Sequence, residues 1–213
     1  MNRLKVTGLA VAALVFGAIQ AQASPIRGVV SGTTTMGEAY PLAHAFDQSG
    51  LSGTYINGVT DFGTFTAATT HDSQAGNDWV SSTVAGSATF NLGSLQTVDG
   101  LAFWNFGGLG GSLAYGITQF SLVASVDAAF TTPLALGTFN PTVYSTLNPA
   151  QIFSFGATTA QYFRLEGFVS NGAGAIGIGE IAFRDAAVPE PASMILLGSG
   201  LGALALRRRR AKS

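Results

Sequence analysis

Between residues 24 and 187, short apolar runs alternate with turn-forming residues about every eight to twelve positions. This spacing is typical of an all-β protein, and few segments have the Leu/Glu/Lys content of a surface helix. In residues 87–92, Ala88, Phe90 and Leu92 fall on one face of a strand, and Thr89 and Asn91 fall on the other. The pattern predicts strands at residues 87–92, 98–106, 117–125, 152–155, 161–168 and 176–184.

The expected architecture is a β-sandwich or barrel with one hydrophobic core. Phe103, Trp104 and Phe106 lie on both faces of their strand, as expected of a strand in the middle of a sheet. Trp79 lies in a similar strand-like pattern, so both tryptophans are predicted to be buried. The other side chains predicted for the core are Phe90, Leu92, Phe103, Leu122, Leu165 and Ile181.

Residues 49–76 interrupt this rhythm. The stretch is polar and rich in Gly and Thr, with Tyr55, Phe62 and Phe65 as its few apolar anchors. A loop of this length is unusual in a small domain, so it is either functional or partly ordered by short strands of its own. A second Gly-rich stretch, residues 107–116, lacks the Gly-Lys-Ser/Thr ending of a phosphate-binding loop and is predicted to connect two strands.

The first 23 residues have the three parts of a secretory signal peptide. Arg3 and Lys5 give a positive start, residues 9–19 are apolar, and Ala21 and Ala23 form a small-x-small cleavage site. We therefore expect the signal peptide to be residues 1–23 and the exported body to be residues 24–187.

The last segment, residues 188–213, has a different composition. Pro189 and Pro191 prevent a helix from running back into the body. Residues 192–206 then form an uncharged apolar run, which as a helix would span about 22 Å, short of the ~30 Å core of a bilayer. The basic tail, residues 207–213, favours a transmembrane helix that stops on the cytoplasmic side, because charged arginines are costly inside a bilayer. Its four consecutive arginines are Arg207, Arg208, Arg209 and Arg210.

This order of a Pro-Glu-Pro signature, an apolar helix and a basic end resembles the PEP-CTERM sorting signal. The signature residues are Val188, Pro189, Glu190 and Pro191. The resemblance implies export by the Sec machinery of a Gram-negative bacterium, a transient anchor in the inner membrane, and processing by an exosortase. The protein would then reach the cell surface or the extracellular space, where such proteins are commonly linked to exopolysaccharide or biofilm. The alternative is an ordinary tail anchor.

The charge of the body differs from that of the whole chain. Three arginines stand against ten acidic residues in residues 24–187, a formal charge of −7, whereas the full chain has −1. The body therefore offers no basic patch for a phosphate backbone, which argues against nucleic-acid binding. The chain has no cysteine, so the exported body depends on core burial instead of disulfide bonds.

A series of short signatures in the body resembles the discoidin-like (coagulation factor V/VIII type C) domain and its galactose-binding-like relatives. They run from Ala45-Phe46-Asp47 through Asn77-Asp78-Trp79-Val80-Ser81 and residues 88–93, 98–104 and 120–127 to Tyr162-Phe163-Arg164-Leu165 and Gly179-Glu180-Ile181. The resemblance implies an eight-stranded jelly-roll β-sandwich. Two departures stand out: Gln48 replaces the family's Gly, and roughly thirty residues separate Asp47 from Trp79.

The same resemblance implies one structural Ca²⁺, held in part by Asp47 and Glu180. These residues are far apart in the sequence but become neighbours if the jelly roll closes. Ca²⁺ takes six to eight oxygen ligands, and loop carbonyls can complete what two carboxylates begin. The alternatives are a solvent-exposed Glu180 and an Asp47 that caps a turn.

No catalytic arrangement stands out, and we predict that the protein is not an enzyme. His44 and His71 are not at metal-ligand spacing, and His71-Asp72 is interpreted as a hydrated turn. Ten acidic residues leave glycoside hydrolysis open, but no pair is singled out.

Two functions fit these observations. The first is a carbohydrate-binding module, in which loop tyrosines stack on sugar rings of an exopolysaccharide. The second is a structural component of the extracellular matrix that binds no glycan. For each candidate tyrosine, the alternative is partial burial as a loop anchor. The candidates are Tyr40, Tyr55, Tyr115 and Tyr144.

Overall fold

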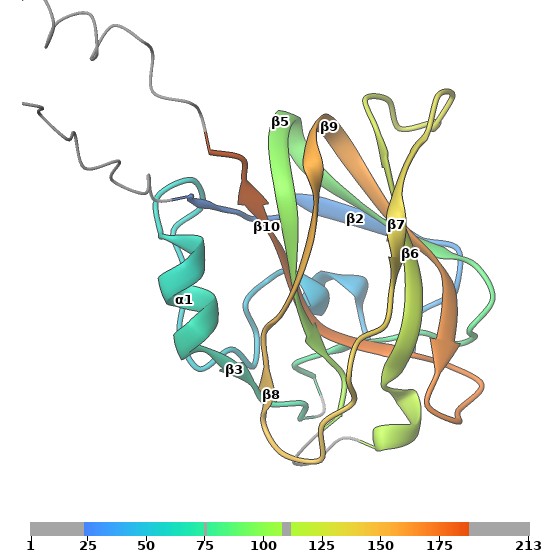
Figure 1. The fold of residues 1–213 in the computed structure, drawn as a ribbon. Coiled ribbons are helices and arrows are strands. Elements are labelled where there is room, and N and C mark those ends of the chain that lie inside the picture. Colours follow the sequence, from blue (N-terminus) through green and yellow to red (C-terminus); the bar gives the residue numbers. More distant parts are fainter. Residues whose placement is uncertain (1–23, 75, 108–111, 188–213) are drawn as a thin grey trace, which may run out of the picture.

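A computed structural model describes residues 24–74, 76–107 and 112–187 (Figure 1). The predicted signal peptide and sorting segment lie outside these residues. Within the described ranges, no helix is both long and apolar enough to cross a membrane. The helices are the 3₁₀ helices η1 (Leu42–Ala45) and η2 (Leu113–Tyr115) and the α-helix α1 (Phe62–Ala68). The strands are β1 (Ile26–Arg27), β2 (Ser31–Thr34), β3 (Thr70–His71), β4 (Trp79–Val80), β5 (Ser87–Asn105), β6 (Ile117–Ser125), β7 (Leu134–Phe139), β8 (Asn148–Pro149), β9 (Gln151–Ser170) and β10 (Gly177–Asp185).

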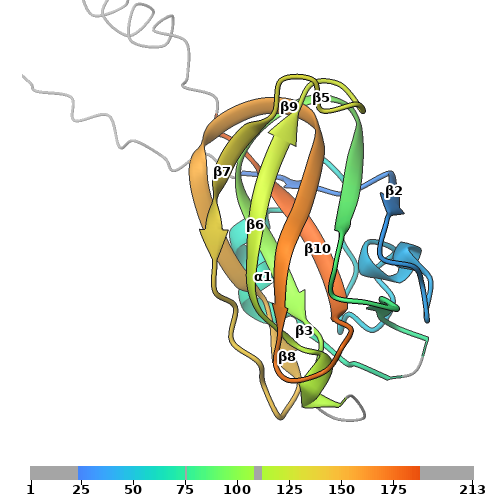
Figure 2. The same ribbon diagram turned by 90° about the vertical axis from the view of Figure 1, so that its right-hand side faces the viewer.

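The strands pair antiparallel in the order β1-β10-β5-β9-β6-β7, with β2 added beside β5, β4 beside β10, and a separate β3–β8 pair. The long strands β5 and β9 build both layers (Figure 2). The first half of β5 pairs with β2 and the second half of β9, whereas its second half pairs with β10 and the first half of β9. The two layers face each other across one core, which gives the predicted jelly-roll β-sandwich.

The predicted strand positions are confirmed, but the strands predicted at 152–155 and 161–168 are one continuous strand, β9, and other strands differ at their ends. β6 has the expected bounds, and β10 starts and ends one residue later than predicted. The two strands predicted at 87–92 and 98–106 are one strand, because Gly93, with φ +83°, forms an irregularity that the pairing spans instead of a turn. The edge strand β7 was not predicted: its apolar run is only three residues long, residues 134–136, and Gly137 and Thr138 follow it.

All six side chains predicted for the core are at most 3 % exposed, and Trp79 and Trp104 are fully buried. The main cluster lies between the two layers and includes Phe90, Phe103 and Ile181. A second, smaller cluster lies on the outer face of β5 and β10, where Trp104 and Ala182 contact Tyr55 and α1. The long insertion therefore covers an apolar surface of the sandwich.

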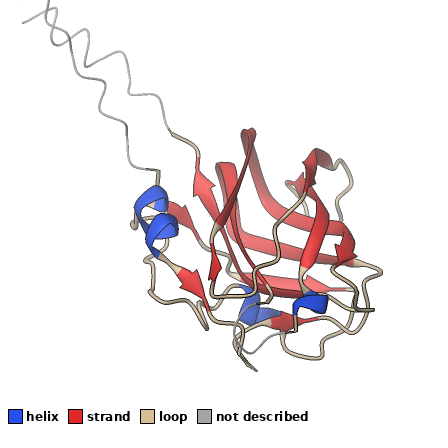
Figure 3. Cartoon of the chain, turned by 60° about the horizontal axis from the view of Figure 1, so that its bottom comes forward, coloured by secondary structure: helices blue, strands red, loops and turns tan. Residues whose placement is uncertain are grey.

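The insertion at 49–76 contains α1, which the sequence interpretation did not include (Figure 3). Asp61 caps this helix, because its Oδ1 accepts hydrogen bonds from the Thr64 amide (2.8 Å) and hydroxyl (2.6 Å). Phe62 and Phe65 face the second cluster. A seven-residue helix is too short to be stable alone, so these tertiary contacts are what hold it.

The first and last strands of the body lie side by side. Ile26 pairs with Arg184 and Arg27 with Phe183, and the Asp185 amide donates to the Pro25 carbonyl at 3.0 Å. Arg27 also donates two hydrogen bonds to the Asp185 carboxylate, at 3.0 and 2.6 Å. The two ends of the body therefore emerge at the same edge of the sandwich (Figure 1).

Candidate functional site

Three of the four candidate tyrosines lie in the segments around the start of β10: Tyr40 and Tyr144 on loops and Tyr115 at the end of η2. Tyr40 forms a bridge with Val80 of β4, and Val80 pairs with Gly177 of β10. Gly177 lies against the ring of Phe106, where an added Cβ would come within 2.4 Å of the ring. The ring of Tyr115 packs edge-on against Phe106, with centroids 6.0 Å apart.

Tyr144 belongs to the same group of loops. Its carbonyl oxygen lies 3.0 Å from where a Cβ on Gly107 would be, and the preceding Val143 packs against Gly116. Tyr40 is 41 % exposed, and Tyr115 and Tyr144 are half-buried. One end of the sandwich therefore carries three accessible tyrosines from three separate segments.

Tyr55, the fourth candidate, does not belong to this surface. It is 7 % exposed and packs edge-on against Phe65, with ring centroids 5.5 Å apart. Burial, together with the neighbouring Glu180, raises the pKa of its hydroxyl. Its ring is a core anchor of the insertion and is not available to stack on a sugar. This burial agrees with the loop-anchor alternative given for Tyr55 in the sequence analysis.

The turn that follows η1 brings the two predicted calcium ligands together. Gln48 donates its amide to Oε2 of Glu180 at 2.9 Å, and its side-chain Oε1 accepts from the Tyr55 amide at 2.8 Å. Gln48 has φ +66°, a left-handed conformation in which glycine is preferred. Gln48 thus adopts a backbone conformation that favours glycine, and its side chain adds a hydrogen bond to the insertion.

Glu180 is completely buried, which excludes the solvent-exposed alternative. Burial raises the pKa of its carboxyl well above the ordinary value, the Gln48 amide opposes this rise, and the charge of Asp47 adds to it. Asp47 is more exposed. Partial burial alone would raise its pKa, but hydrogen bonds from Ser49 and His44 lower it. Asp47 therefore also caps the turn, because its Oδ1 accepts from the Ser49 amide at 2.8 Å.

These two carboxylates fit part of a calcium site. Oε1 of Glu180 is buried without a hydrogen bond of ordinary geometry, although the Tyr55 hydroxyl lies near this carboxyl group, and Asp47 lies close enough to influence its charge. Among the described residues, no set of three His, Cys, Asp or Glu side chains converges on one point. A bound Ca²⁺ would therefore take its remaining oxygens from carbonyls or neutral side chains, and it would supply the positive charge that Asp47 and Glu180 lack.

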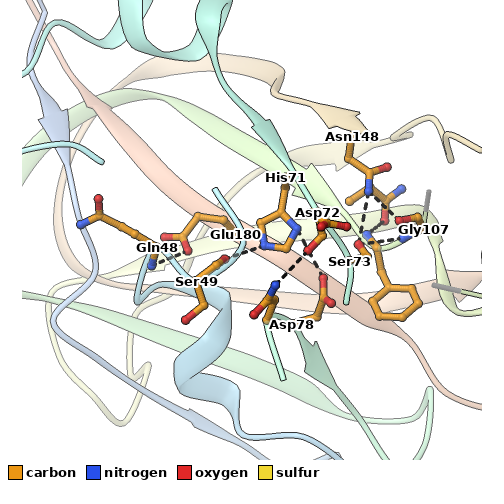
Figure 4. A network of polar contacts seen from close by, with 12 residues as sticks. Gln48, Ser49, His71, Asp72, Ser73, Asp78, Gly107, Asn148 and Glu180 are labelled. Atoms are coloured by element: carbon orange, nitrogen blue, oxygen red, sulfur yellow. Dashed lines mark hydrogen bonds and ion pairs between the residues drawn. The ribbon is translucent and has the colours of Figure 1, made fainter. Parts of the chain in front are cut away.

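A buried polar network extends from this turn, and the sequence interpretation missed it (Figure 4). His71 is fully buried, so the predicted hydrated turn at His71-Asp72 is wrong. Ser73 and Asn148 continue the network. The Ser73 hydroxyl accepts from the Gly107 amide and from Nδ2 of Asn148, both at 3.3 Å, and the Asn148 amide also donates to the Gly107 carbonyl at 2.9 Å. The network thus joins the insertion, β8 and the loop that follows β5.

Comparison with solved structures identifies the fold as that of a family 32 carbohydrate-binding module (CBM32). Truncated AlyQ, with CBM32 and alginate lyase domains, has a TM-score of 0.51 at 20 % identity over 79 % of this chain and 35 % of its own. The family 32 module of Clostridium perfringens NanJ, in complex with galactose, has a TM-score of 0.50 at 14 % identity. The match covers 76 % of this chain and 99 % of the NanJ module. The structure of the CBM32-1, CBM32-2 and M60 catalytic domains of C. perfringens ZmpB has a TM-score of 0.51 at 10 % identity. The match covers 78 % of this chain and 15 % of the ZmpB chain.

The chain is further defined by its C-terminus: residues 187–210 match the PEP-CTERM protein-sorting motif. This confirms the sorting signal inferred from Val188, Pro189, Glu190 and Pro191, and it implies export and membrane-anchored sorting. The helix predicted at 192–206, the four arginines and the cleavage site at Ala21 and Ala23 lie outside the described residues. No curated protein matches the chain.

Proposed function

We propose that residues 24–187 form a non-catalytic carbohydrate-binding module that the sorting segment delivers to the cell surface, with an exopolysaccharide as its ligand. The observation that carries this proposal is the CBM32 fold with three loop tyrosines gathered at one end. The structural neighbours support it, because the NanJ module holds galactose and the AlyQ module accompanies an alginate lyase domain.

The tyrosines would act by stacking. An aromatic face packs well against the apolar C–H face of a sugar, and its hydroxyl remains free for hydrogen bonds. Tyr115 and Tyr144 are the tyrosines that we expect to contact the sugar first. Tyr115 packs against Phe106, and the backbone of Tyr144 lies against the adjacent Gly107, so the two segments are held next to each other. Tyr40 would extend the surface over β4.

Processing and metal binding complete the proposal. An exosortase would act near the Pro-Glu-Pro residues after Sec export, while residues 192–206 anchor the precursor in the inner membrane. Ca²⁺ held in part by Asp47 and Glu180 would be structural, because it would connect the turn after η1 to β10 without lying among the loop tyrosines.

The test is affinity electrophoresis of the full chain in detergent through gels that contain galactan, alginate or pectin. Binding slows migration in at least one gel. Replacing Tyr115 or Tyr144 with Ala should weaken binding about 3- to 10-fold, the free-energy range of one aromatic contact. Tyr162→Ala is the matched control, because Tyr162 lies in the middle of β9, paired with Asn91 and Ser125. Equal weakening by Tyr162→Ala would refute the loop site, and unaltered migration in every gel would favour the structural matrix protein.

A further inference from the structure

His71 holds the insertion against the sandwich. Its ring lies on the backbone of Gly179 in β10, where an added Cβ would come within 2.7 Å of Nδ1. Nε2 is 2.8 Å from the Ser49 carbonyl oxygen. Because a carbonyl can only accept, Nε2 must carry a hydrogen. In the neutral ring, Nδ1 therefore presents a lone pair.

Nδ1 faces the carboxyl group of Asp78. Nδ1 and Oδ1 of Asp78 are 3.5 Å apart, Asp78 is 2 % exposed, and neither atom has a hydrogen-bond partner (Figure 4). Two buried lone pairs that face each other are unfavourable, and a proton between them removes the conflict. The proton can lie on either atom, because Asp–H···N and Asp⁻···H–N⁺ are both satisfied arrangements.

Apart from a Ca²⁺ that Asp47 and Glu180 would hold, the described surroundings of the pair offer no other compensating charge. The ionisable groups nearby are Asp72 on the same loop, Asp47 on the turn after η1, and Glu180 on β10, with Tyr55 beside Glu180. β8 contributes the neutral Asn148. None of the ion pairs or hydrogen bonds among the described residues brings an arginine to this cluster. A proton is therefore the available positive charge.

The two side chains also titrate in directions that favour one shared proton. Burial raises the pKa of Asp78 to about 7, with Ser73 opposing this rise and Asp72 adding to it. Burial lowers the pKa of His71, although the backbone carbonyls of Ser49 and Asn77 and the neighbouring Asp72 and Asp47 oppose this. The closed structure thus disfavours both a doubly protonated and a fully deprotonated pair.

We propose that His71 and Asp78 share a single proton that fastens the insertion and β8 to the sandwich, and that loss of this proton above neutral pH loosens both. The segments that would loosen are joined through His71, which lies in β3, because β3 pairs with β8 and Leu51 bridges to His71. Loosening would also reach Gly107, which Asn148 and Ser73 hold.

The sign of the effect follows from the protons bound by each state. We call the form with the His71–Asp78 contact closed and the form without it open. In the open form, Asp78 and His71 have their ordinary pKa values of 3.8 and 6.5. Between these values the open form carries one proton, on His71, and the closed form also carries one, so opening is independent of pH. Between pH 6.5 and about 7 the open form carries none while the closed form still holds one, so rising pH favours opening across this window. Below pH 3.8 the open form takes up a second proton, so acid favours opening as well.

Asp78→Asn tests the proposal because its amide imitates a protonated carboxyl at every pH. The full chain in detergent is labelled with ¹⁵N-histidine, and its two histidines give separable signals. In the wild type, the His71 signals should keep the Nε2–H tautomer and shift near pH 7, whereas in Asp78→Asn they should not shift there. At pH 8, the amides of Asp72 and Asn148 should exchange hydrogen about 3-fold more slowly in Asp78→Asn than in the wild type, since the rise from 6.5 in the open form to about 7 in the closed form is half a pKa unit and a full unit is a tenfold effect. Glu38→Gln, which removes an exposed carboxylate, should match the wild type.

Either measurement can overturn the proposal. A shift near pH 7 that persists in Asp78→Asn would show that another group titrates. Equal exchange at pH 8 in Asp78→Asn and the wild type would show that the proton does not fasten the insertion. If Asp78→Asn does not fold, the wild-type spectra decide: His71 signals that stay unchanged from pH 5.5 to 8.5 exclude the shared proton.

Discussion

Phe103 provides the sharpest test of how the two layers are joined. It is fully buried in the second half of β5, and its ring stacks on Phe120 of β6, with centroids 5.1 Å apart and planes 29° apart. It also contacts Phe153 of β9, at a centroid distance of 6.3 Å. Its ring therefore links three strands that are distant in sequence.

Phe103→Ala should lower the free energy of unfolding of residues 24–187 by about 3–5 kcal/mol, the range for a fully buried Phe. That loss is a third or more of the roughly 5–15 kcal/mol that stabilises a typical domain. For a domain of this size, about 2–4 °C per kcal/mol gives a fall in Tm of about 6–20 °C. Phe139 is a matched control, because it contacts Phe120 and Phe153 from the edge strand β7 and is only partly buried. Phe139→Ala should cost about half as much.

The assay is equilibrium unfolding in urea, followed by tryptophan fluorescence and by circular dichroism. Coincident transitions would justify a two-state analysis. A cost below about 1 kcal/mol for Phe103→Ala, or one no larger than that of Phe139→Ala, would contradict the placement of Phe103 at the centre of a single core.

Two further predictions concern the metal and the anchor. Millimolar calcium should raise the Tm of residues 24–187 relative to EDTA, by an amount equivalent to about 2.7 kcal/mol at a hundredfold excess over Kd. Asp47→Ala and Glu180→Ala should each abolish that shift, and an unchanged wild-type Tm would end the calcium proposal. In a host without an exosortase, the full chain should stay in membranes after a carbonate wash, whereas a chain ending at Ala187 should be soluble. Release of the full chain by carbonate would contradict the anchor at 192–206.

Local patterns predicted the strands of the core well, because the side chains of consecutive strand residues alternate between a buried and an exposed face. Phe90 and Leu92 alternate with polar neighbours and are buried as expected. The edge strand β7 was missed because most of its residues are exposed and its apolar and polar residues do not alternate. α1 has a local signal in its Asp61 cap, but Phe62 and Phe65 are held by tertiary contacts that a sequence window does not show.

The candidate site was less predictable because its contacts are long-range. His71 is buried by Ser49, Asp78 and Gly179, which lie in three separate segments. Nothing next to His71 in the sequence marks it as a core residue. Glu180 could be placed near the turn at Asp47 through the family resemblance, whereas its contact with the Gln48 amide required the structure.

The pairing of β1 with β10 also bears on when the domain can finish folding. Arg27 and Asp185, whose ion pair closes this edge, are 158 positions apart. An exported chain emerges with its N-terminus first, so β1 must wait without its β10 partner on the outer side of the membrane, with only its bonds to residues 58–60 available earlier. Long-range pairing of this kind is slow to form and leaves strand edges exposed in the meantime. The sorting motif begins directly after β10, so closure of the sandwich and arrival of the motif at the membrane would fall within the same few residues of translocation.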